Sequence, residues 1–434
     1  MTNKRPFRFV VAILLVSIAP ASFALAENWP TWRGPQQNGI SSEQNLPTVW
    51  SQTENVAWRL PLPGAAPSTP VIWEDRIFLT STDRESEDVL LLAIDTAGKI
   101  LWQRQIGSGE SEQAEKNNLA APSPSTDGKH IWTFTGDGNL ACHDFQGNPL
   151  WQFNVEDRYE KVEMRWGMAS SPTPYGDILY VQLLHLNSSR VIAVNKTTGS
   201  EVWNVERKTD AQGKCMRSYA TPIVYRDKQH EYLLTQGQDY IVAHDLNTGQ
   251  ELWRWGDFHP QTGYDEMMHM SASPVAAEGI ILVPSGNNGN FQALRPNGQG
   301  LITSDEKHRL WHDYISPMRP SALLVDSIAY VCQEAGVLHC LDANTGEQHY
   351  KKPIHRHTHH ASPVYADGKI YFASRDGTVT VVQAGTDFKI LATNAMDEPL
   401  CASPAISHGR IYLRTFDALY AIESQQRGEG TVSR

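Results

Sequence analysis

Arginine, histidine, methionine and aromatic side chains gather in several short loops of the sequence, each close to a proline. Arginine suits a carboxylate or phosphate, which it binds through paired hydrogen bonds. Aromatic and methionine side chains supply the apolar walls of ligand pockets, although methionine also serves as an adaptable filler of space. If these loops converge, they form a pocket; the alternative is that they are packing and solvated loop residues. The nine candidate ligand-binding residues are Trp166, Met168, Arg217, Tyr219, His269, Arg319, His357, His359 and His360.

A metal or catalytic site is the weaker interpretation of the same loops. The run HRHTHH at residues 355–360, with His269, offers imidazoles that could bind zinc or copper. Alternation along an extended chain would place His355, His357 and His359 on one side and His360 on the other. No thiolate or carboxylate spacing supports a metal site, and Asp265 and Glu266 are typical solvated loop acids. We therefore predict no metal site and no catalytic residue.

The elements that position these loops repeat along the chain. Residues 218–255 contain three short apolar runs separated by turn residues, followed by an Asn-Thr-Gly turn and a last run that ends at a tryptophan. This pattern predicts an antiparallel sheet of four strands. Such a sheet cannot bury both of its faces alone, so it requires copies of itself.

The copies recur about every 40–50 residues, a period typical of β-propellers. A proline, in most repeats within a Ser/Thr/Ala-x-Pro opening, recurs at Pro70, Pro124, Pro172, Pro222, Pro274, Pro320, Pro363 and Pro404, and the closing tryptophan at Trp102, Trp151, Trp203 and Trp253. We expect each of these tryptophans to cover a seam between blades. Residues 55–62 look like a last strand, which the final repeat lacks. We predict an all-β, eight-bladed propeller of four-stranded antiparallel blades, closed by the N-terminal strand pairing with the last blade.

Charge and the chain ends bear on the compartment and the partners. The formal net charge is −11 with no basic run, which disfavours nucleic acid as a partner. Residues 1–26 combine a basic start, a short apolar run and an Ala-Leu-Ala site, a pattern typical of a cleaved signal peptide. We expect an exported bacterial protein, periplasmic or extracellular, monomeric and without a transmembrane segment after cleavage. An arm at 27–54, the propeller at 55–424 and a disordered tail at 425–434 complete the predicted organisation. Five cysteines without paired spacing predict no disulfide.

The repeat A-x-D-x-x-T-G-x-x-x-W resembles the propeller repeat of pyrroloquinoline-quinone (PQQ) proteins over roughly residues 29–424. That repeat occurs in quinoprotein alcohol dehydrogenases and in BamB-like outer-membrane assembly proteins. For the dehydrogenases the resemblance implies bound PQQ, calcium, an aspartate base and often a disulfide between adjacent cysteines. The sequence has no adjacent cysteines and no haem-attachment motif. For BamB-like proteins it implies a scaffold that presents loops to partners.

These observations lead to three hypotheses. The first is an exported, non-catalytic PQQ-like propeller that acts as a binding or assembly scaffold through its axial face, with no cofactor and an unidentified protein, small-molecule or carbohydrate ligand. The alternative is a divergent PQQ-dependent quinoprotein oxidoreductase with PQQ and calcium. The third is a propeller that binds a carbohydrate or an anion at the candidate residues.

Overall fold

The computed structural model describes residues 27–109, 118–164, 167–186, 189–260, 262–268, 270–286, 289–303 and 305–424. Two of the nine candidate ligand-binding residues, Trp166 and His269, lie outside these ranges. The predicted signal peptide and the predicted C-terminal tail also lie outside them.

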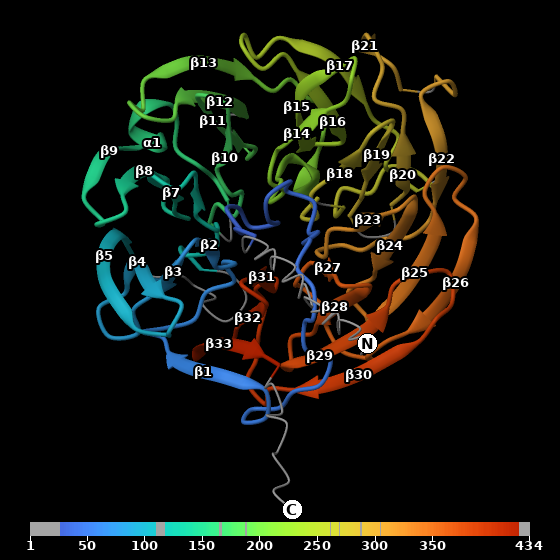
Figure 1. Cartoon of the computed structure of the whole chain (residues 1–434). Coiled ribbons are helices and arrows are strands. Elements are labelled where there is room, and N and C mark those ends of the chain that lie inside the picture. Colours follow the sequence, from blue (N-terminus) through green and yellow to red (C-terminus); the bar gives the residue numbers. More distant parts are fainter. Residues whose placement is uncertain are drawn as a thin grey trace, which may run out of the picture.

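Eight antiparallel sheets stand around a central axis as the blades of a propeller (Figure 1). In seven blades the strands follow chain order, and the eighth is completed by β1 (Val56–Pro61) from the N-terminal part of the chain. Strand β1 pairs with β33 (Ala418–Glu423), so segments from both ends of the chain close the ring. The predicted eight-bladed fold and its mode of closure are confirmed.

We number the blades in chain order and give their strands from the axis outwards. Blade 1 comprises β2 (Val71–Trp73), β3 (Arg76–Thr82), β4 (Asp88–Asp95) and β5 (Ile100–Ser108). Blade 2 comprises β6 (Ser125–Thr126), β7 (His130–Phe134), β8 (Asn139–Asp144) and β9 (Pro149–Asn154). Blade 3 comprises β10 (Thr173–Tyr175), β11 (Ile178–Leu183), β12 (Arg190–Asn195) and β13 (Glu201–Glu206). Blade 4 comprises β14 (Ile223–Arg226), β15 (Glu231–Gly237), β16 (Tyr240–His244) and β17 (Glu251–Trp255).

The second half of the ring is built in the same way. Blade 5 comprises β18 (Val275–Ala277), β19 (Ile280–Val283), β20 (Phe291–Leu294) and β22 (Arg309–Asp313). Blade 6 comprises β23 (Leu323–Val325), β24 (Ile328–Cys332), β25 (Val337–Asp342) and β26 (Gln348–Pro353). Blade 7 comprises β27 (Val364–Ala366), β28 (Lys369–Ala373), β29 (Thr378–Gln383) and β30 (Ile390–Ala395). Blade 8 comprises β31 (Ala405–Ser407), β32 (Arg410–Arg414), β33 and β1.

Few elements depart from this plan. The insertion before Trp311 contributes β21 (Gly300–Leu301), which adds to β17 of blade 4 in parallel. The described residues contain one short α-helix, α1 (Val155–Arg158), and one 3₁₀ helix (Gly213–Met216). None of their helices has the length and apolar character that crossing a membrane requires. All five cysteines are free thiols.

The outer tryptophans join each blade to the next. The Trp203 ring in blade 3 lies against Gly249 of blade 4, and its Nε1 donates to the Leu246 carbonyl at 2.9 Å. Gly249 has a φ of 72°, and a Cβ there would come within 2.5 Å of the indole, so only glycine fits this turn. The predicted role of these rings at the seams is confirmed. The same pairing occurs between Trp58 and Gly98, Trp102 and Gly147, Trp151 and Gly199, and Trp311 and Gly346.

The repeat in blade 6 begins two residues later than the proline pattern predicted. Ala322, not Pro320, stands where the other blades have their anchor proline, because β23 begins at Leu323 as β18 begins after Pro274. The proline pattern pointed to Pro320 because it is the nearest proline. In the structure, Ser321-Ala322 takes the place of the Ser-Pro or Thr-Pro pair of the other blades, with alanine at the proline position. Arg319 is therefore two residues further from the inner strand than the sequence indicated.

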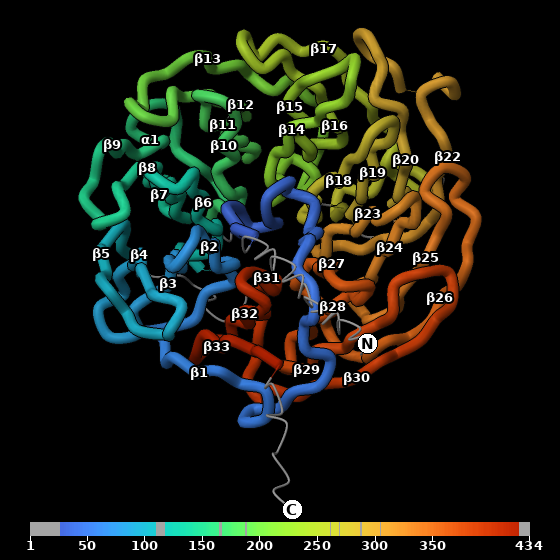
Figure 2. Tube along the Cα trace, in the orientation of Figure 1, coloured from blue at the N-terminus to red at the C-terminus, as the bar shows by residue number. Residues whose placement is uncertain are grey.

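The N-terminal arm lies across one end of the axial channel, where Figure 2 shows it crossing the ring. Trp29 exchanges backbone hydrogen bonds with Ile72 of blade 1, and Ser41 donates to the Tyr365 carbonyl of blade 7. The buried Arg33 guanidinium donates to the Ala322 carbonyl at 2.8 Å. The first half of the arm is thus fixed to blades 1, 6 and 7.

Candidate functional site

A ring of serine and threonine hydroxyls surrounds the axis. In seven blades, the residue two positions before the inner strand donates its backbone N–H to the side-chain oxygen of the equivalent residue in the next blade. The bonds run from Thr69 to Ser123 (2.9 Å), Ser123 to Ser171 (3.0 Å), Ser171 to Thr221 (3.0 Å), Thr221 to Ser273 (2.8 Å), Ser273 to Ser321 (2.9 Å), Ser321 to Ser362 (3.0 Å) and Ser362 to Ser403 (3.0 Å). We call these eight residues the hydroxyl ring.

The hydroxyl ring has a different link where the chain closes it. Between blades 8 and 1, Arg414 of β32 donates to the Ser68 side-chain oxygen at 2.6 Å and to the Thr80 carbonyl at 2.5 Å. Arg414 is 1% exposed, and burial lowers its pKa to about 9. This guanidinium therefore ties the last blade to the first.

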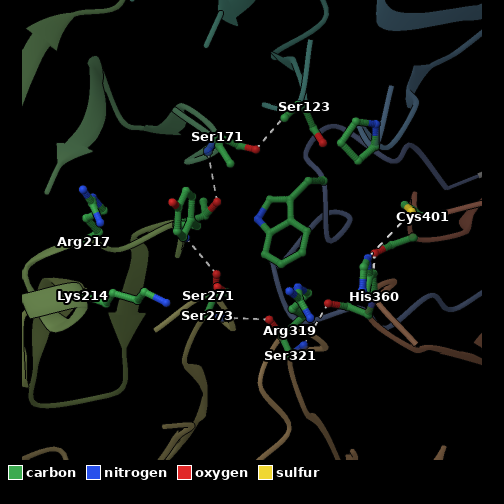
Figure 3. A pocket seen from close by; sticks show the side chains of 18 residues that line it. Ser123, Ser171, Lys214, Arg217, Ser271, Ser273, Arg319, Ser321, His360 and Cys401 are labelled. Carbon is green, nitrogen blue, oxygen red and sulfur yellow. Dashed lines mark hydrogen bonds between the residues drawn. The ribbon is translucent and has the colours of Figure 1, made fainter. Parts of the chain in front are cut away.

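A second ring, which we call the variable ring, lies two residues upstream of the hydroxyl ring in every blade. Its members are Pro67, Ala121, Ala169, Tyr219, Ser271, Arg319, His360 and Cys401. All eight line an axial cavity of about 380 Å³, together with seven members of the hydroxyl ring. Lys214, Arg217 and Trp32 complete the wall (Figure 3).

The axial cavity has a floor, formed by the N-terminal arm, and a mouth, surrounded by the variable ring. The arm contacts positions downstream of the hydroxyl ring, such as Ile72 and Thr126, whereas the variable ring lies upstream of it. Because the inner strands run along the axis, the arm closes one end of the channel and the variable ring surrounds the other. Trp32 reaches the cavity from the arm, and its Nε1 is a buried donor without a partner among the described residues.

The charged side chains of the cavity wall are cationic. Lys214, Arg217 and Arg319 line it, and no described carboxylate does. Arg319 forms an ion pair with Glu334, which lies behind the wall. No described ion pair involves Lys214 or Arg217, so within the described residues no carboxylate compensates their charges, although the formal net charge of the protein is −11. The hydroxyl-ring oxygens accept backbone N–H groups, which leaves their own protons available to donate towards the axis.

His360 connects two neighbours in the wall. Its Nε2 lies 3.2 Å from Glu334 Oε1, and its Nδ1 lies 3.9 Å from Cys401 Sγ. Burial lowers the pKa of His360, and Arg319 lowers it further against the opposing effect of Glu334. Burial raises the pKa of Cys401 to about 11, so the thiol is protonated at neutral pH.

Of the nine predicted residues, the structure brings four together and places three elsewhere. Arg217, Tyr219, Arg319 and His360 line the axial cavity. The described ranges do not include Trp166 and His269.

The remaining three predicted residues lie elsewhere. Met168 is 3% exposed and packs in the core between blades 2 and 3, so it acts there as a space-filling side chain. His359 is buried, with its Nδ1 at 2.9 Å from the His357 carbonyl, and His357 lines a separate surface groove beside blade 6. The His355 ring contacts both His357 and His359, whereas His360 turns to the cavity, as the alternation predicted.

Sequence reasoning missed Trp32, Lys214, Ser271 and Cys401. Ser271 and Cys401 hold the variable-ring position in their loops. The loop of Cys401 has mainly small and apolar side chains, so nothing in its composition pointed to a ligand site. The sequence signal that could have found Ser271 and Cys401 is their position, since every variable-ring residue lies two residues before a serine or threonine of the hydroxyl ring. Counting from the prolines hid this distance in blade 6, where the proline is displaced.

A further cluster lies in the loops of blades 4 and 5. Donor atoms of Cys215, Asp239 and His259 lie within 4.8 Å of one another. The Asp265 N–H donates to His259 Nδ1 at 3.2 Å, which places the ring proton on Nε2, 3.1 Å from Asp239 Oδ1. A protonated Nε2 has no lone pair for a metal, so we assign this cluster the structural role of joining these loops.

Comparison with known proteins assigns the family. A family model described as "Outer membrane protein assembly factor BamB" matches residues 86–352 and, in an overlapping second match, residues 299–387. The first match alone spans more than half of the chain. The chain belongs to this family. A search of curated proteins found no match.

Solved structures with this fold include BamB and quinone-dependent enzymes. BamB from Moraxella catarrhalis is 15% identical, with a TM-score of 0.62 over 84% of this chain and 99% of that one. A europium-containing methanol dehydrogenase is 12% identical, with a TM-score of 0.66 over 90% of each chain. The quinohemoprotein alcohol dehydrogenase from Comamonas testosteroni is 11% identical, with a TM-score of 0.67 over 92% of this chain and 81% of that one. At these identities the similarity shows the fold alone.

The dehydrogenase similarity raises the question of PQQ and calcium. Calcium binds about six to eight oxygen ligands, carboxylates prominent among them. The described wall of the axial cavity offers hydroxyls and three cationic side chains but no carboxylate. This donor set does not fit a calcium ion.

Proposed function

We propose that the protein is a binding scaffold of the BamB family that takes up an acidic segment of a partner protein in its axial cavity. The observation that carries the proposal is the composition of the cavity wall. Lys214 and Arg217 bring uncompensated positive charge, and the hydroxyl ring brings a circle of O–H donors. Charge-assisted hydrogen bonds from such groups favour carboxylates.

The size and exposure of the cavity suit a side chain from a partner better than a folded domain. Its volume of about 380 Å³ lies at the lower end of the range for ligand pockets. Lys214 is exposed and Arg217 half-buried at the mouth, so an incoming carboxylate meets charge before it meets the hydroxyl ring. Opposite charge at an opening speeds association and selects partners.

An oxidoreductase function has less support from this wall. A PQQ enzyme would need calcium ligands, and the described lining supplies none of the carboxylates that calcium prefers. The quinone itself is an acid and could compete for the cationic wall as any other anion would. We therefore treat PQQ as a competitor in the test below and derive no redox step.

The compartment is part of the same proposal. The sequence pattern at residues 1–26 supports export with cleavage after Ala26. The Glu27 backbone nitrogen lies 2.8 Å from Glu43 Oε1, so cleavage would create an α-ammonium group beside a carboxylate. Intact-mass measurement of the exported protein should give a chain that begins at Glu27; a chain that keeps residues 1–26 would contradict this step.

Calorimetric titration with a peptide of three consecutive glutamates tests the proposed function. We expect saturable binding to the wild-type protein and binding at least about tenfold weaker for the matched glutamine peptide, because only carboxylates gain charge-assisted bonds. Lys214→Ala with Arg217→Ala should reduce affinity by a similar factor. Neither cation has an acidic partner among the residues that the structure describes, so the double variant should fold normally.

Controls separate the cavity from general charge. Arg226 is an exposed arginine on blade 4 with 71% side-chain exposure, outside the cavity, and Arg226→Ala should bind the glutamate peptide as the wild type does. Citrate and PQQ should compete with the peptide, and added calcium should change neither affinity. Equal affinity for both peptides, or PQQ binding that requires calcium, contradicts the proposal.

A further inference from the structure

Cys401, His360 and Glu334 form a row of three side chains from three successive blades. Cys401 precedes blade 8, His360 precedes blade 7, and Glu334 lies in the turn between β24 and β25 of blade 6. Cys401 Sγ lies 3.9 Å from His360 Nδ1, and His360 Nε2 lies 3.2 Å from Glu334 Oε1. A thiol, an imidazole and a carboxylate in this order match the arrangement that activates a nucleophile in acyl transfer.

The carboxylate fixes the protonation of the imidazole. An ionised carboxylate only accepts hydrogen bonds, so His360 must carry its proton on Nε2 to pair with Glu334. Its Nδ1 then presents a lone pair to the Cys401 thiol and can accept the thiol proton. The two nitrogens face opposite neighbours, so the same groups do not converge on a shared metal ion.

The surroundings of the row are cationic. Arg319 forms an ion pair with Glu334 through Oε1, the same carboxylate oxygen that His360 contacts. Arg319 and Arg375 both favour the thiolate form of Cys401, although burial outweighs them and keeps the resting thiol neutral. A neutral thiol needs a base at the moment of attack, and His360 is the base in contact with it.

The row opens into the axial cavity. Cys401 and His360 both belong to the cavity wall. Figure 3 shows Lys214 and Arg217 on the other side of the cavity from Cys401 and His360. A bound molecule can therefore place an anionic end against the cations while an electrophilic carbon faces the thiol.

We propose that Cys401 is a nucleophilic thiol, activated by His360 and positioned through Glu334, that accepts an acyl group from a carboxylate-bearing ester or thioester. The thiol proton passes to His360 Nδ1, a bond forms between Sγ and the acyl carbon, and the bond from that carbon to the leaving oxygen or sulfur breaks. The leaving group takes the proton from His360. The preference for an anionic donor rests on the proposed function of the cavity, whereas the nucleophilicity of Cys401 does not.

Alkylation of the folded protein by iodoacetamide, followed by peptide mass mapping, tests the thiol by itself. Cys401 should be modified first. The internal controls are the four other cysteines, Cys142, Cys215, Cys332 and Cys340, each at most 2% exposed and outside the cavity wall. Modification of Cys401 no faster than of these four would overturn the proposal.

Two variants test the relay. His360→Asn removes the base and should slow alkylation of Cys401 roughly 10- to 100-fold, in line with general-base contributions. Glu334→Gln keeps the shape but can donate to Nε2, which moves the ring proton to Nδ1 and should also slow the reaction. Thermal unfolding of both variants checks that they fold. Unchanged rates in both folded variants would contradict the assignment.

The pH profile separates a relay from mere exposure. With His360 as the base, the alkylation rate should change little between pH 8 and pH 6.5, because burial holds the pKa of His360 below its usual value and keeps it neutral there. In Glu334→Gln this flat region should disappear. A wild-type rate that falls about tenfold per pH unit over this range, as for an unassisted thiol, would contradict the relay.

A pair of esters tests the class of acyl donor. Mono-4-nitrophenyl succinate should release 4-nitrophenol and add one succinyl group to Cys401, and 4-nitrophenyl butyrate should react at least about tenfold more slowly. Lys214→Ala with Arg217→Ala should remove this preference without slowing iodoacetamide. Equal reaction with both esters would overturn the anionic-donor assignment, and lack of any adduct on Cys401 would overturn acyl transfer.

Discussion

The hydroxyl ring and the variable ring lie two residues apart in every blade, yet they differ in kind. The hydroxyl ring holds only serine and threonine, because in seven of the eight blades the side chain accepts a backbone N–H from the adjacent blade. No such bond constrains the variable ring, whose members range from proline to cysteine. The comparison shows that one position per blade joins the blades, and that the position two residues before it is free to carry chemistry.

The variable ring is itself uneven. Blades 1 to 3 contribute Pro67, Ala121 and Ala169, whereas blades 4 to 8 contribute Tyr219, Ser271, Arg319, His360 and Cys401. The loops of blade 4 also supply Lys214 and Arg217. An eightfold architecture thus carries a one-sided site, because the uniform ring holds the blades while the adjacent position varies.

The largest expected effect separates two tryptophans of the arm. Trp29 is fully buried against blades 1 and 8, and Trp29→Ala should lower the free energy of unfolding by about 3–5 kcal/mol. Trp32 lies in the cavity wall and is half-buried, so Trp32→Ala should cost much less stability. Urea unfolding of both variants checks the comparison. Equal losses of stability would contradict the separate roles of Trp29, which anchors the arm in the core, and Trp32, which lines the cavity.

Acid pH should lower the stability of the blade cores through a buried histidine. His244 is 2% exposed in blade 4, and burial lowers its pKa to about 4, with Arg207 lowering it further. The unfolded chain therefore binds the proton first as pH falls, and stability should decrease between pH 6.5 and pH 4 by up to about 1.4 kcal/mol per pH unit for this group. His244→Asn should reduce the slope, and urea unfolding of the wild type and the variant at pH 7, 6 and 5 measures it; an unchanged slope would contradict this assignment.

The two rings can be compared within a single blade. Ser273→Ala removes the acceptor of the buried Thr221 N–H and should cost about 1–3 kcal/mol. Ser271→Ala changes the variable ring two residues away and should stay within about 0.5 kcal/mol of the wild type. Thermal or urea unfolding gives both values, and a larger loss for Ser271→Ala would reverse our assignment of the rings.

The smallest expected effect on stability belongs to the cations at the mouth. Lys214 and Arg217 make no described ion pair, so replacing both by alanine should change the free energy of unfolding by less than about 0.5 kcal/mol. A loss above about 2 kcal/mol would show that these side chains hold the loop rather than a ligand.

The fold could be predicted from the sequence because each blade repeats a local pattern. The Thr-Gly turn and the following tryptophan report contacts between adjacent blades, such as Trp203 on Gly249, that each repeat must make. Strand β1 was recognisable because it carries the missing closing tryptophan, Trp58. These signals depend on short-range geometry that one sequence displays.

The site could be predicted only in part because convergence on the axis depends on register. The loops pointed to Arg217, Tyr219, Arg319 and His360, which the structure brings together. Met168 shares such a loop but turns into the core, since its position lies one residue before the variable ring. The position of Cys401 two residues before Ser403 indicates its place in the variable ring, but its contact with His360 joins blades 41 residues apart in the chain and leaves no local pattern.

The affinity of two variants for the three-glutamate peptide, measured in one calorimetric series, tests the central claim most directly. We predict that Lys214→Ala with Arg217→Ala loses at least about tenfold in affinity, whereas Arg226→Ala, which changes an exposed arginine outside the cavity, binds as the wild type does. Retention of affinity in the double variant, or an equal loss in Arg226→Ala, would contradict binding of the carboxylates by the cationic wall of the axial cavity.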